Sequence, residues 1–163
     1  METINSIKNQ QGTYFLVLFV KNLVQISTRR FKWTFVPGYY FYFGSAKGIS
    51  SNTIENRILR HFKTNKKIFW HIDHLTTHFE VDVTQAYYSI DPIRTECSAL
   101  QQFRDSFENL DVILNFGSSD CISKCGGHLV YNCNNPQKKP ELEDYLYAYG
   151  WTNFKRDDLK YER

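Results

Sequence analysis

The chain has 163 residues, a length that predicts one domain with a hydrophobic core of its own. Its hydrophobic content of 42% is ordinary for a globular protein, whereas 17% aromatic residues favour sheet faces and flat stacking surfaces. The net charge of +3 permits a nucleic-acid partner without requiring one, and the absence of any run of roughly 18 apolar residues excludes a membrane span.

The start of the sequence and its cysteines indicate a compartment. Residues 1–5 (METIN) lack the basic and then apolar order of a signal peptide, so we expect an intracellular, cytoplasmic protein, associated with the nucleoid if the cell is prokaryotic. The four cysteines are then expected as free thiols or metal ligands rather than disulfides. Basic residues concentrate in the first 67 residues, which predicts one basic face, with ordinary solvated surface as the alternative.

The first third of the chain is predicted to be mainly strands. Residues 13–20 are a continuous apolar run, typical of a strand buried on both faces. Residues 23–28 and 31–36 predict further strands or the arms of a hairpin. A turn at Pro37-Gly38 leads into an aromatic strand over 39–43, which we expect to end at Gly44, before a basic helix start.

A helix is predicted over residues 53–63, with its N-cap at Ser51 or Asn52. Arg57 and His61, four residues apart, are expected to share one face of this helix. Three apolar side chains at four-residue spacing are expected to form its buried stripe on another face: Ile54, Ile58 and Phe62.

The remaining chain alternates between predicted helices and strands. In chain order we expect a short helix over 68–77, a strand over 79–90, a helix from Asp91-Pro92 to 107, strands over 112–116 and 128–132, and an amphipathic helix over 141–149. The fold class is therefore α/β: one domain with a small mixed or antiparallel sheet flanked by helices. Residues 1–135 form its main body, and 136–163 a linker, a C-terminal helix and a polar tail.

Five side chains suggest a site that hydrolyses phosphodiester bonds. Such hydrolysis needs a base for the attacking water and cations for the developing negative charge. Tyr14 and Tyr42 offer phenolic oxygens from neighbouring strands, Arg57 a bidentate guanidinium for phosphate, and His61 a proton relay. Glu96 offers a carboxylate for a hard cation such as Mg²⁺. The alternatives are packing tyrosines, an exposed helix face and a carboxylate that favours the helix dipole.

These residues carry a resemblance to a known family. Gly12-Thr13-Tyr14 and Tyr42-Phe43-Gly44 resemble the two short motifs of the GIY-YIG nuclease superfamily, with Thr and Phe in place of Ile. Arg57 matches the catalytic arginine of that family, His61 a histidine of its homing-endonuclease members, and Glu96 its metal-binding glutamate. The resemblance implies a GIY-YIG-like fold and a DNA endonuclease that depends on Mg²⁺ or Mn²⁺.

A narrower resemblance covers nearly the whole domain. The chain is similar to a poorly characterised branch of the superfamily that is sometimes fused to a DNA-repair glycosylase of the endonuclease III type. This branch implies a role in repair, recombination or processing of branched or damaged DNA, alongside a DNA-repair protein partner. The DNA structure that is cut and the oligomeric state stay open. The segments that carry the resemblance are GTYFLVL, PGYYFYFGSA, RILRHF, WHIDHL, TEC, and FGSSDC with HLVY.

Four further residues are second-tier candidates for the active site. Lys47 follows the second tyrosine motif and would favour a phenolate by its charge. His71 and His74, three residues apart, are placed to share a helical face and bind phosphate or a metal, with a hydrogen-bonded structural pair as the alternative. Asp120 lies where nucleases often place a late polar residue beside the metal or the leaving group.

The cysteines suggest a second kind of site. Cys121, Cys125 and His128 follow a Cys-x₃-Cys-x₂-His spacing, and Cys97 would complete a tetrahedral zinc set of three thiolates and one imidazole. The alternative is buried thiols that pack a loop, with His128 or Asp120 at the rim of the active site.

Three functions are therefore weighed. The leading hypothesis is a metal-dependent endonuclease, in which either Tyr14 or Tyr42 is the base. The second is a non-catalytic nucleic-acid-binding module of the same fold. The third is a zinc-stabilised interaction domain, for which the cysteine cluster is the only support.

Overall fold

A computed structural model describes residues 7, 9–118, 121, 125–133, 138 and 141–155. The strands of the main sheet are β1 (Gly12–Val20), β4 (Gly38–Ala46), β5 (Val81–Ser89), β6 (Leu110–Val112), β7 (Leu129–Asn132) and β8 (Thr152–Asn153). The remaining elements are a hairpin of β2 (Val24–Ser27) and β3 (Lys32–Phe35), the 3-10 turn η1 (Ser50–Asn52), and the helices α1 (Ile54–Phe62), α2 (His71–Thr76), α3 (Glu96–Ser106) and α4 (Glu143–Tyr149).

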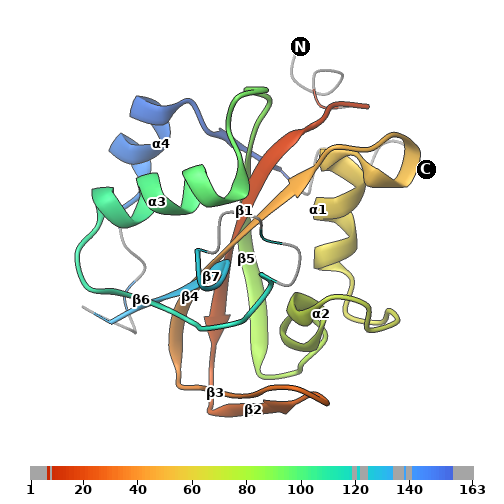
Figure 1. Cartoon of the computed structure of the whole chain (residues 1–163), viewed down its shortest axis with the longest axis vertical. Coiled ribbons are helices and arrows are strands. Elements are labelled where there is room, and N and C mark those ends of the chain that lie inside the picture. Colours follow the sequence, from red (N-terminus) through yellow and green to blue (C-terminus); the bar gives the residue numbers. More distant parts are fainter. Residues whose placement is uncertain are drawn as a thin grey trace.

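The molecule has three layers (Figure 1). The six strands lie in the order β6-β7-β4-β1-β5-β8, and every neighbouring pair is antiparallel. Helices α1 and α2 cover one face of this sheet, and α3 and α4 cover the other. The predicted α/β domain with an antiparallel sheet flanked by helices is confirmed. No helix in the described part of the chain is long and apolar enough to cross a membrane.

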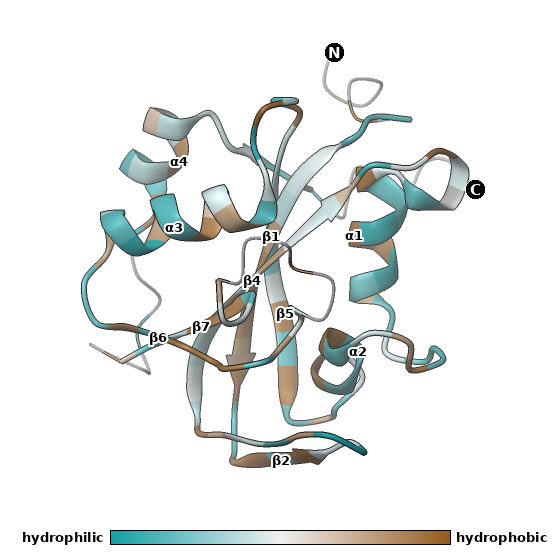
Figure 2. Cartoon of the chain, viewed as in Figure 1, coloured by the Kyte–Doolittle hydropathy of each residue, from teal (hydrophilic) through white to brown (hydrophobic). Residues whose placement is uncertain are grey.

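Apart from Tyr39, the buried tyrosines and phenylalanines of the two central strands lie on opposite faces of the sheet. Successive side chains of a strand point to opposite faces, so β1 and β4 place Tyr14, Tyr40 and Tyr42 on the side of α1 and α2. We call this side the Tyr face. The opposite Phe face carries Phe15, Phe41 and Phe43 against α3 and α4. Figure 2 shows strong apolar colouring on parts of β1 and β5, and alternating apolar and hydrophilic bands along the helices.

Glycines allow the close approaches that this register needs. Tyr14 on β1 pairs with Gly44 on β4, and its ring lies across that glycine. A Cβ on Gly44 would lie 2.5 Å from the Tyr14 hydroxyl oxygen, so only glycine leaves room for the ring. A Cβ on Gly12 would collide with the Ser89 carbonyl oxygen. At both glycine positions of the tyrosine motifs, a larger side chain would therefore collide with a neighbouring residue.

The predicted strand end at Gly44 and the helix start after it are wrong. Strand β4 continues to Ala46 because its last residues pair with the first residues of β1, Gly12 opposite Ala46. Helix α1 begins after Thr53, whose hydroxyl accepts a hydrogen bond from the Asn56 N–H, so Thr53 is the N-cap in place of Ser51 or Asn52.

The buried stripe of α1 also differs from the prediction. Ile54 and Ile58 are fully buried, but the third member is His61 rather than Phe62, which is only partly buried. Positions 54, 58 and 61 follow the i, i+4, i+7 spacing of one helix face. His61 therefore points into the core, one turn after Arg57, and both residues lie beside Tyr14.

Two later boundaries differ as well. Helix α3 begins at Glu96 rather than at Asp91-Pro92, because the Asp91 carboxylate accepts the Ile93 N–H in a turn and a capping box at Thr95 and Ser98 starts the helix. The strand predicted over 112–116 is β6, which ends at Val112. Asn115 has a left-handed backbone (φ 65°), which ends any strand there.

The C-terminal part of the described chain joins the main body. Leu142, Tyr145 and Trp151 pack with the Phe face, and Phe154 with the Tyr face. Strand β8 pairs with β5, so the first residues of the predicted polar tail extend the main sheet. The predicted linker over 136–140, apart from Lys138, and the tail beyond 155 lie outside the described residues.

Candidate active site and metal centre

A cavity of about 310 Å³ lies at the end of the Tyr face, beside the start of β1, the end of β4 and the first turn of α3. It brings together residues far apart in the sequence. The predicted site residues that line it are Tyr14, Tyr42, Lys47, Arg57, Glu96, Cys97, Cys121 and His128. The four side chains expected to converge for catalysis, two tyrosines, an arginine and a glutamate, therefore share one cavity.

Tyr14 is hydrogen-bonded to a histidine behind the cavity wall. Its hydroxyl oxygen lies 2.7 Å from Nε2 of His61, and both side chains are buried. Burial raises the pKa of the Tyr14 phenol well above its ordinary value, although the charge of Arg57 opposes that shift. The phenol is therefore neutral at neutral pH and needs a proton acceptor, which the adjacent imidazole supplies.

His61 is held neutral. Burial lowers its pKa to about 3, and the positive charge of Lys66 adds to the shift. Its Nδ1 has no hydrogen-bond partner among the described residues, so Tyr14 is the one polar contact found for the ring. A neutral imidazole keeps one ring nitrogen free to accept a proton.

Tyr42 lies next to Tyr14, and among the described residues no histidine is hydrogen-bonded to its hydroxyl. Its ring meets His61 edge-on at 6.0 Å between centroids. Burial raises its pKa, and the neighbouring Tyr14 adds to the shift. The ring also touches the backbone at Gly117, where a Cβ would lie 3.0 Å from a ring carbon. The structure thus distinguishes two tyrosines that the sequence treats alike.

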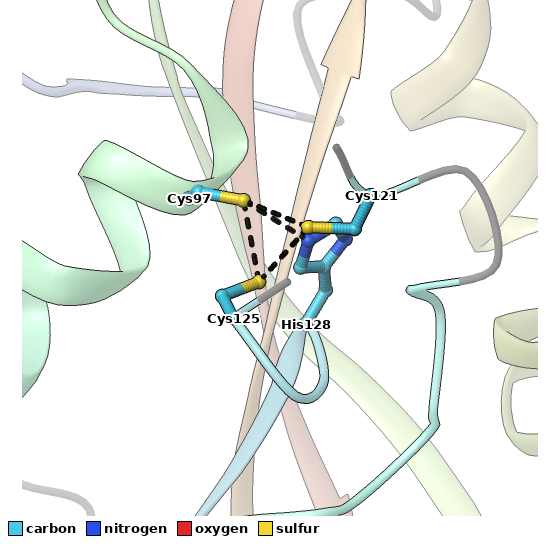
Figure 3. A group of neighbouring side chains, drawn as sticks. All are labelled: Cys97, Cys121, Cys125 and His128. Carbon is cyan, nitrogen blue, oxygen red and sulfur yellow. Dashed lines mark hydrogen bonds between the residues drawn. The ribbon is translucent and has the colours of Figure 1, made fainter. Parts of the chain in front are cut away.

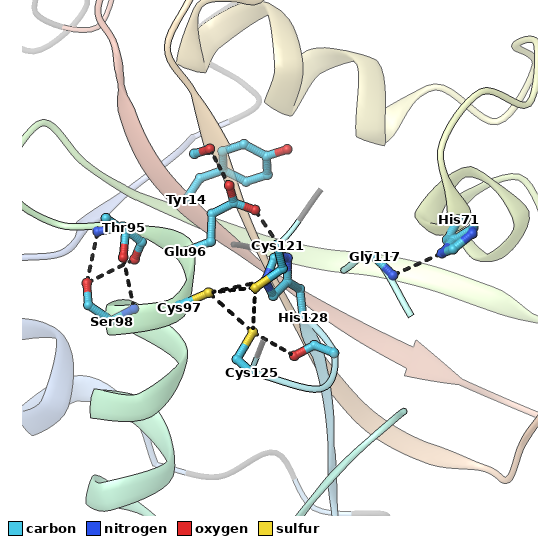
Figure 4. Close-up of polar contacts among 12 residues, drawn as sticks. Tyr14, His71, Thr95, Glu96, Cys97, Ser98, Gly117, Cys121, Cys125 and His128 are labelled. Atoms are coloured by element: carbon cyan, nitrogen blue, oxygen red, sulfur yellow. Dashed lines mark hydrogen bonds and ion pairs between the residues drawn. The ribbon is translucent and has the colours of Figure 1, made fainter. Parts of the chain in front are cut away.

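Glu96 enters the cavity from the first position of α3. Its Oε1 accepts a hydrogen bond of 2.7 Å from the Ser45 hydroxyl, and its Oε2 lies 3.2 Å from Nδ1 of His128 (Figure 4). Burial alone would raise the pKa of Glu96, but His128 and Ser45 outweigh it and lower that pKa. Among the described residues, Glu96 is the only acidic side chain that lines the cavity.

Arg57 is fixed on the opposite wall. Its Nη1 donates a hydrogen bond of 2.7 Å to the Ser45 carbonyl oxygen, and its guanidinium lies over the Trp70 ring at 5.1 Å. Its Nη2 lies 3.5 Å from the Asn52 side-chain oxygen. These contacts hold the guanidinium at the cavity wall, where it adds a fixed positive charge.

Two residues that the sequence reasoning did not assign complete the site. Ser45 contacts Glu96 through its hydroxyl and Arg57 through its carbonyl, so one residue positions both charges. Trp70 stacks under both Arg57 and Arg60. The available signals were their positions, Ser45 directly after the second tyrosine motif and Trp70 at the start of the WHIDHL segment.

The structure does not bring His71 or His74 to the cavity. His71 packs against Trp33, and its Nδ1 accepts a hydrogen bond of 3.0 Å from the Gly117 N–H. Burial lowers the pKa of His71, which suits an acceptor nitrogen. Its role is thus to hold the loop at Gly117, which lines the cavity. Asp120 lies outside the described residues, so its predicted role stays a prediction.

The acidic residue of the WHIDHL segment has a structural role. Asp73 is fully buried, and one carboxylate oxygen accepts hydrogen bonds from Arg60 and from the backbone N–H groups of Phe69 and Trp70. Lys66 lies 3.6 Å from the other oxygen. Burial alone would raise the pKa of Asp73, but these partners lower it. Asp73 therefore anchors α2 and the arginine that stacks on Trp70.

Cys97, Cys121, Cys125 and His128 form one compact cluster (Figure 3). The three sulfur–sulfur distances are 3.2, 3.2 and 3.3 Å, and Nε2 of His128 lies 3.5 Å from the Cys97 sulfur. A disulfide needs about 2.05 Å, so the thiols are not bonded to each other. Tetrahedral zinc with Zn–S bonds of about 2.3 Å separates its sulfurs by roughly 3.8 Å, which small side-chain shifts would reach.

The donor set suits a metal such as zinc. The predicted partnership of Cys97 with the other three side chains is confirmed as geometry, and these atoms all lie within 4.8 Å of one another. Burial raises the pKa of Cys97 and Cys125, whereas hydrogen bonds from the Cys125 backbone and from the neighbouring side chains outweigh burial and lower the pKa of Cys121 to about 6. A thiol that loses its proton easily is ready for a cation.

Over residues 13–150 the sequence matches a family described as Domain of unknown function DUF123. The chain belongs to this family. The DUF123 match runs from the start of β1 to the end of α4 and beyond it, so it contains every residue that lines the cavity and all four donors of the cluster. No curated protein and no solved structure matches the chain.

Proposed function

We propose that the chain is a divalent-metal-dependent endonuclease that hydrolyses phosphodiester bonds in DNA. The observation that carries this proposal is the convergence of Tyr14, Tyr42, Arg57 and Glu96 on one cavity, with His61 hydrogen-bonded behind Tyr14. Base, cation and carboxylate are the groups that phosphodiester hydrolysis needs.

Tyr14 is the tyrosine that acts as base in this proposal. It is hydrogen-bonded to a neutral imidazole, so its hydroxyl oxygen can take a proton from the attacking water as its own proton passes to Nε2 of His61. The negative charge of a bound phosphate favours the imidazolium that results. This relay needs no free phenolate, which burial of Tyr14 opposes. Tyr42, which lacks such a partner, positions the water or the phosphate.

The positive groups of the cavity stabilise the charge on phosphorus. Arg57 is held by Ser45 and Trp70 and presents its guanidinium to a phosphate oxygen. Lys47 is exposed at the cavity rim and adds a second charge. Fixed cations of this kind are effective because they need no reorganisation during the reaction.

Glu96 would hold Mg²⁺ or Mn²⁺, because it is the single cavity carboxylate and its contacts keep it ionised. When bound, such an ion neutralises the charge of the phosphate oxygens. The three thiols and His128 would hold zinc, which ties the first turn of α3 to the loop before β7.

A basic groove beside the cavity supports a nucleic-acid substrate. The groove has a volume of about 680 Å³ and is lined by Arg60, Lys63 and Lys66 together with several asparagines. Arg60 reaches it from Trp70, whose ring also lines the cavity. Lys63 is exposed there, and Arg60 and Lys66 share the single carboxylate of Asp73, so the groove lining keeps a positive charge that suits a phosphate backbone. Repair, recombination or processing of branched or damaged DNA is the role that we propose.

A nicking assay tests the function. Wild-type protein and the variants Tyr14→Phe and Glu96→Ala are incubated with plain, branched and abasic duplexes and with Mg²⁺ or Mn²⁺. Loss of the base or the metal ligand is expected to lower the cleavage rate about 10²–10⁴-fold. Tyr40→Phe is the matched control, because Tyr40 lies on the same face of β4 but its hydroxyl donates to the Val36 carbonyl, away from the cavity.

Two results would overturn the proposal. An unchanged rate in Glu96→Ala would remove this carboxylate from the active site. Failure of wild type to cut any substrate, together with binding to the same duplexes, would leave a non-catalytic nucleic-acid-binding module.

A further inference from the structure

His128 stands between the two sites. Its Nε2 faces the thiols, 3.5 Å from the Cys97 sulfur, and its Nδ1 faces the cavity, 3.2 Å from Oε2 of Glu96 (Figure 4). The imidazole is nearly fully buried, with 4% of its side chain exposed. Among the described residues, Nδ1 has no hydrogen-bond partner, so the carboxylate at ion-pair distance is its one polar neighbour.

This arrangement is the one that metal-bound histidines adopt. A ligating imidazole donates the N–H of its other nitrogen to a carboxylate or a carbonyl, which fixes the ring and its tautomer. With Nε2 directed to the thiols, the proton of a metal-bound ring resides on Nδ1, which faces Glu96. The carboxylate is thus placed as the orienting partner of the metal ligand.

Glu96 is itself fixed by the same element that supplies a thiolate. Glu96 and Cys97 are the first two residues of α3, and the capping box of Thr95 and Ser98 sets where that helix begins. The Ser45 hydroxyl holds the other carboxylate oxygen. A carboxylate has about four acceptor positions, and the Glu96 side chain remains 34% exposed towards the cavity. Two contacts therefore leave room for a third.

We propose that Glu96 is shared between the two sites: it orients His128 in the Cys₃His metal centre, and the metal centre in return fixes Glu96 in the cavity. The first half concerns metal binding alone. The second half rests on the proposed nuclease function and makes His128 a positioning residue for the carboxylate.

The shared carboxylate predicts a dependence of one site on the other. Cys121 and His128 line the cavity as well as the cluster, so loss of zinc frees both of them and the Glu96 contact at once. Cleavage is then expected to fail although Tyr14, His61 and Arg57 keep their places on β1 and α1.

Zinc affinity tests the first half without any nuclease readout. The full chain and its variants are titrated with Zn²⁺ against a chromogenic chelator. Glu96→Gln, which keeps the size of the side chain but loses its charge, is expected to weaken zinc binding about 10–100-fold. Tyr42→Phe is the matched control, since Tyr42 lines the same cavity without a polar contact to His128; its affinity should stay within about twofold of wild type.

A second measurement needs no variant. The ¹⁵N shifts of the His128 ring in zinc-loaded wild type should show Nε2 bound to metal and Nδ1 carrying a proton. Metal on Nδ1, wild type that binds no zinc, or equal zinc affinity in Glu96→Gln and wild type would each overturn the proposal.

The two halves fail separately. If Glu96→Gln binds zinc more weakly but wild type cuts no DNA, the role of Glu96 towards His128 stands and the nuclease function falls. If wild type cuts DNA at the same rate before and after zinc is removed, at saturating Mg²⁺, the dependence of the cavity on the metal centre is overturned.

Discussion

The Tyr face and the Phe face of the sheet are built from the same two strands, yet they carry different chemistry. On the Phe face, Phe15 and Phe43 stack at 5.3 Å, and Phe103 from α3 packs against both. The other described buried members of the core cluster on this side are Phe41, aliphatic side chains, tyrosines and a tryptophan. On the Tyr face, buried His61 is hydrogen-bonded to Tyr14 of β1, and buried Asp73 lies in α2 on the same side of the sheet.

The difference teaches how one sheet separates stability from chemistry. A strand alternates its side chains, so a single register serves an apolar layer and a polar layer one residue apart. The Phe face contributes mainly apolar burial, and its buried Trp151 N–H donates to the Tyr145 hydroxyl. Each polar group of the Tyr face needs a partner, and Asp73 has two cations and two backbone N–H groups. Substitutions on the Phe face should therefore lower the stability of the fold through lost packing, whereas substitutions on the Tyr face should leave buried polar groups without partners.

The largest expected effect lies on the Phe face. Phe103→Ala removes a fully buried ring that contacts four other phenylalanines, so the free energy of unfolding should fall by about 3–5 kcal/mol. The cleavage rate per folded molecule should not change. Urea denaturation and the nicking assay measure both, with Phe79→Ala, at an 80% exposed position, as the control. A lower cleavage rate in folded Phe103→Ala would contradict the view that the Phe face contributes stability alone.

The variant Asp73→Asn tests whether a buried charge on the Tyr face also stabilises the fold. It leaves Arg60 and the nearly buried Lys66 without their carboxylate, and the expected loss is about 3 kcal/mol. Asp82→Asn is the control, because its ion pair with Lys21 is exposed and should contribute less than about 1 kcal/mol. Equal losses in the two variants, measured by urea denaturation, would contradict a structural role for Asp73.

Gly44→Ala tests the contact between the two tyrosine motifs. The added methyl would lie 2.5 Å from the Tyr14 hydroxyl oxygen, so the ring must move and the loss is expected at about 1–3 kcal/mol. In a Tyr14→Leu background the same change should cost much less, because the opposing atoms are gone. Additive losses in this double-mutant cycle would show that the two residues do not meet.

The effect of His61 on stability appears only in acid. The pKa of His61 is about 3 in the folded protein against 6.5 in the unfolded chain. Between pH 3 and pH 6.5 the unfolded state therefore binds a proton at His61 and the folded state does not. The free energy of unfolding should therefore fall by about 1.4 kcal/mol per pH unit below 6.5. Denaturation of wild type and His61→Gln from pH 7 to pH 4 measures the difference in slope. Parallel curves would mean that His61 titrates normally.

The sequence predicts the elements of this fold better than their ends. The apolar run of β1 and the hairpin arms are strong local patterns, and the structure contains both. Asp91-Pro92 and Thr95 are both good helix starts, and the choice between them depends on which side chain caps which N–H. The burial of His61 depends on how α1 rotates against the sheet, which a count of apolar residues does not reveal.

The residues of the site are also predicted from the sequence only where they are close together in the chain. Spacing suggests that Cys121, Cys125 and His128 belong together, but Cys97 is 24 residues away from Cys121 and joins them only through the packing of α3. His71 is placed in the sequence as a candidate ligand, whereas its contact with the Gly117 backbone, 46 residues on, gives it a structural role. Contacts of this range follow from the assembled sheet rather than from any local pattern.

The central position of β1 bears on how the cavity can move. Its backbone pairs with β4 on one side and with β5 on the other from Thr13 to Val20. Amides in such a strand exchange with solvent only when much of the sheet opens. The strand beneath Tyr14 is therefore rigid, and the first turn of α3 and the backbone at Gly117 are the parts of the cavity wall that can move independently of β1. In the proposed nuclease, the base would be in place before the substrate binds, and the entry of DNA would depend on the motion of these walls.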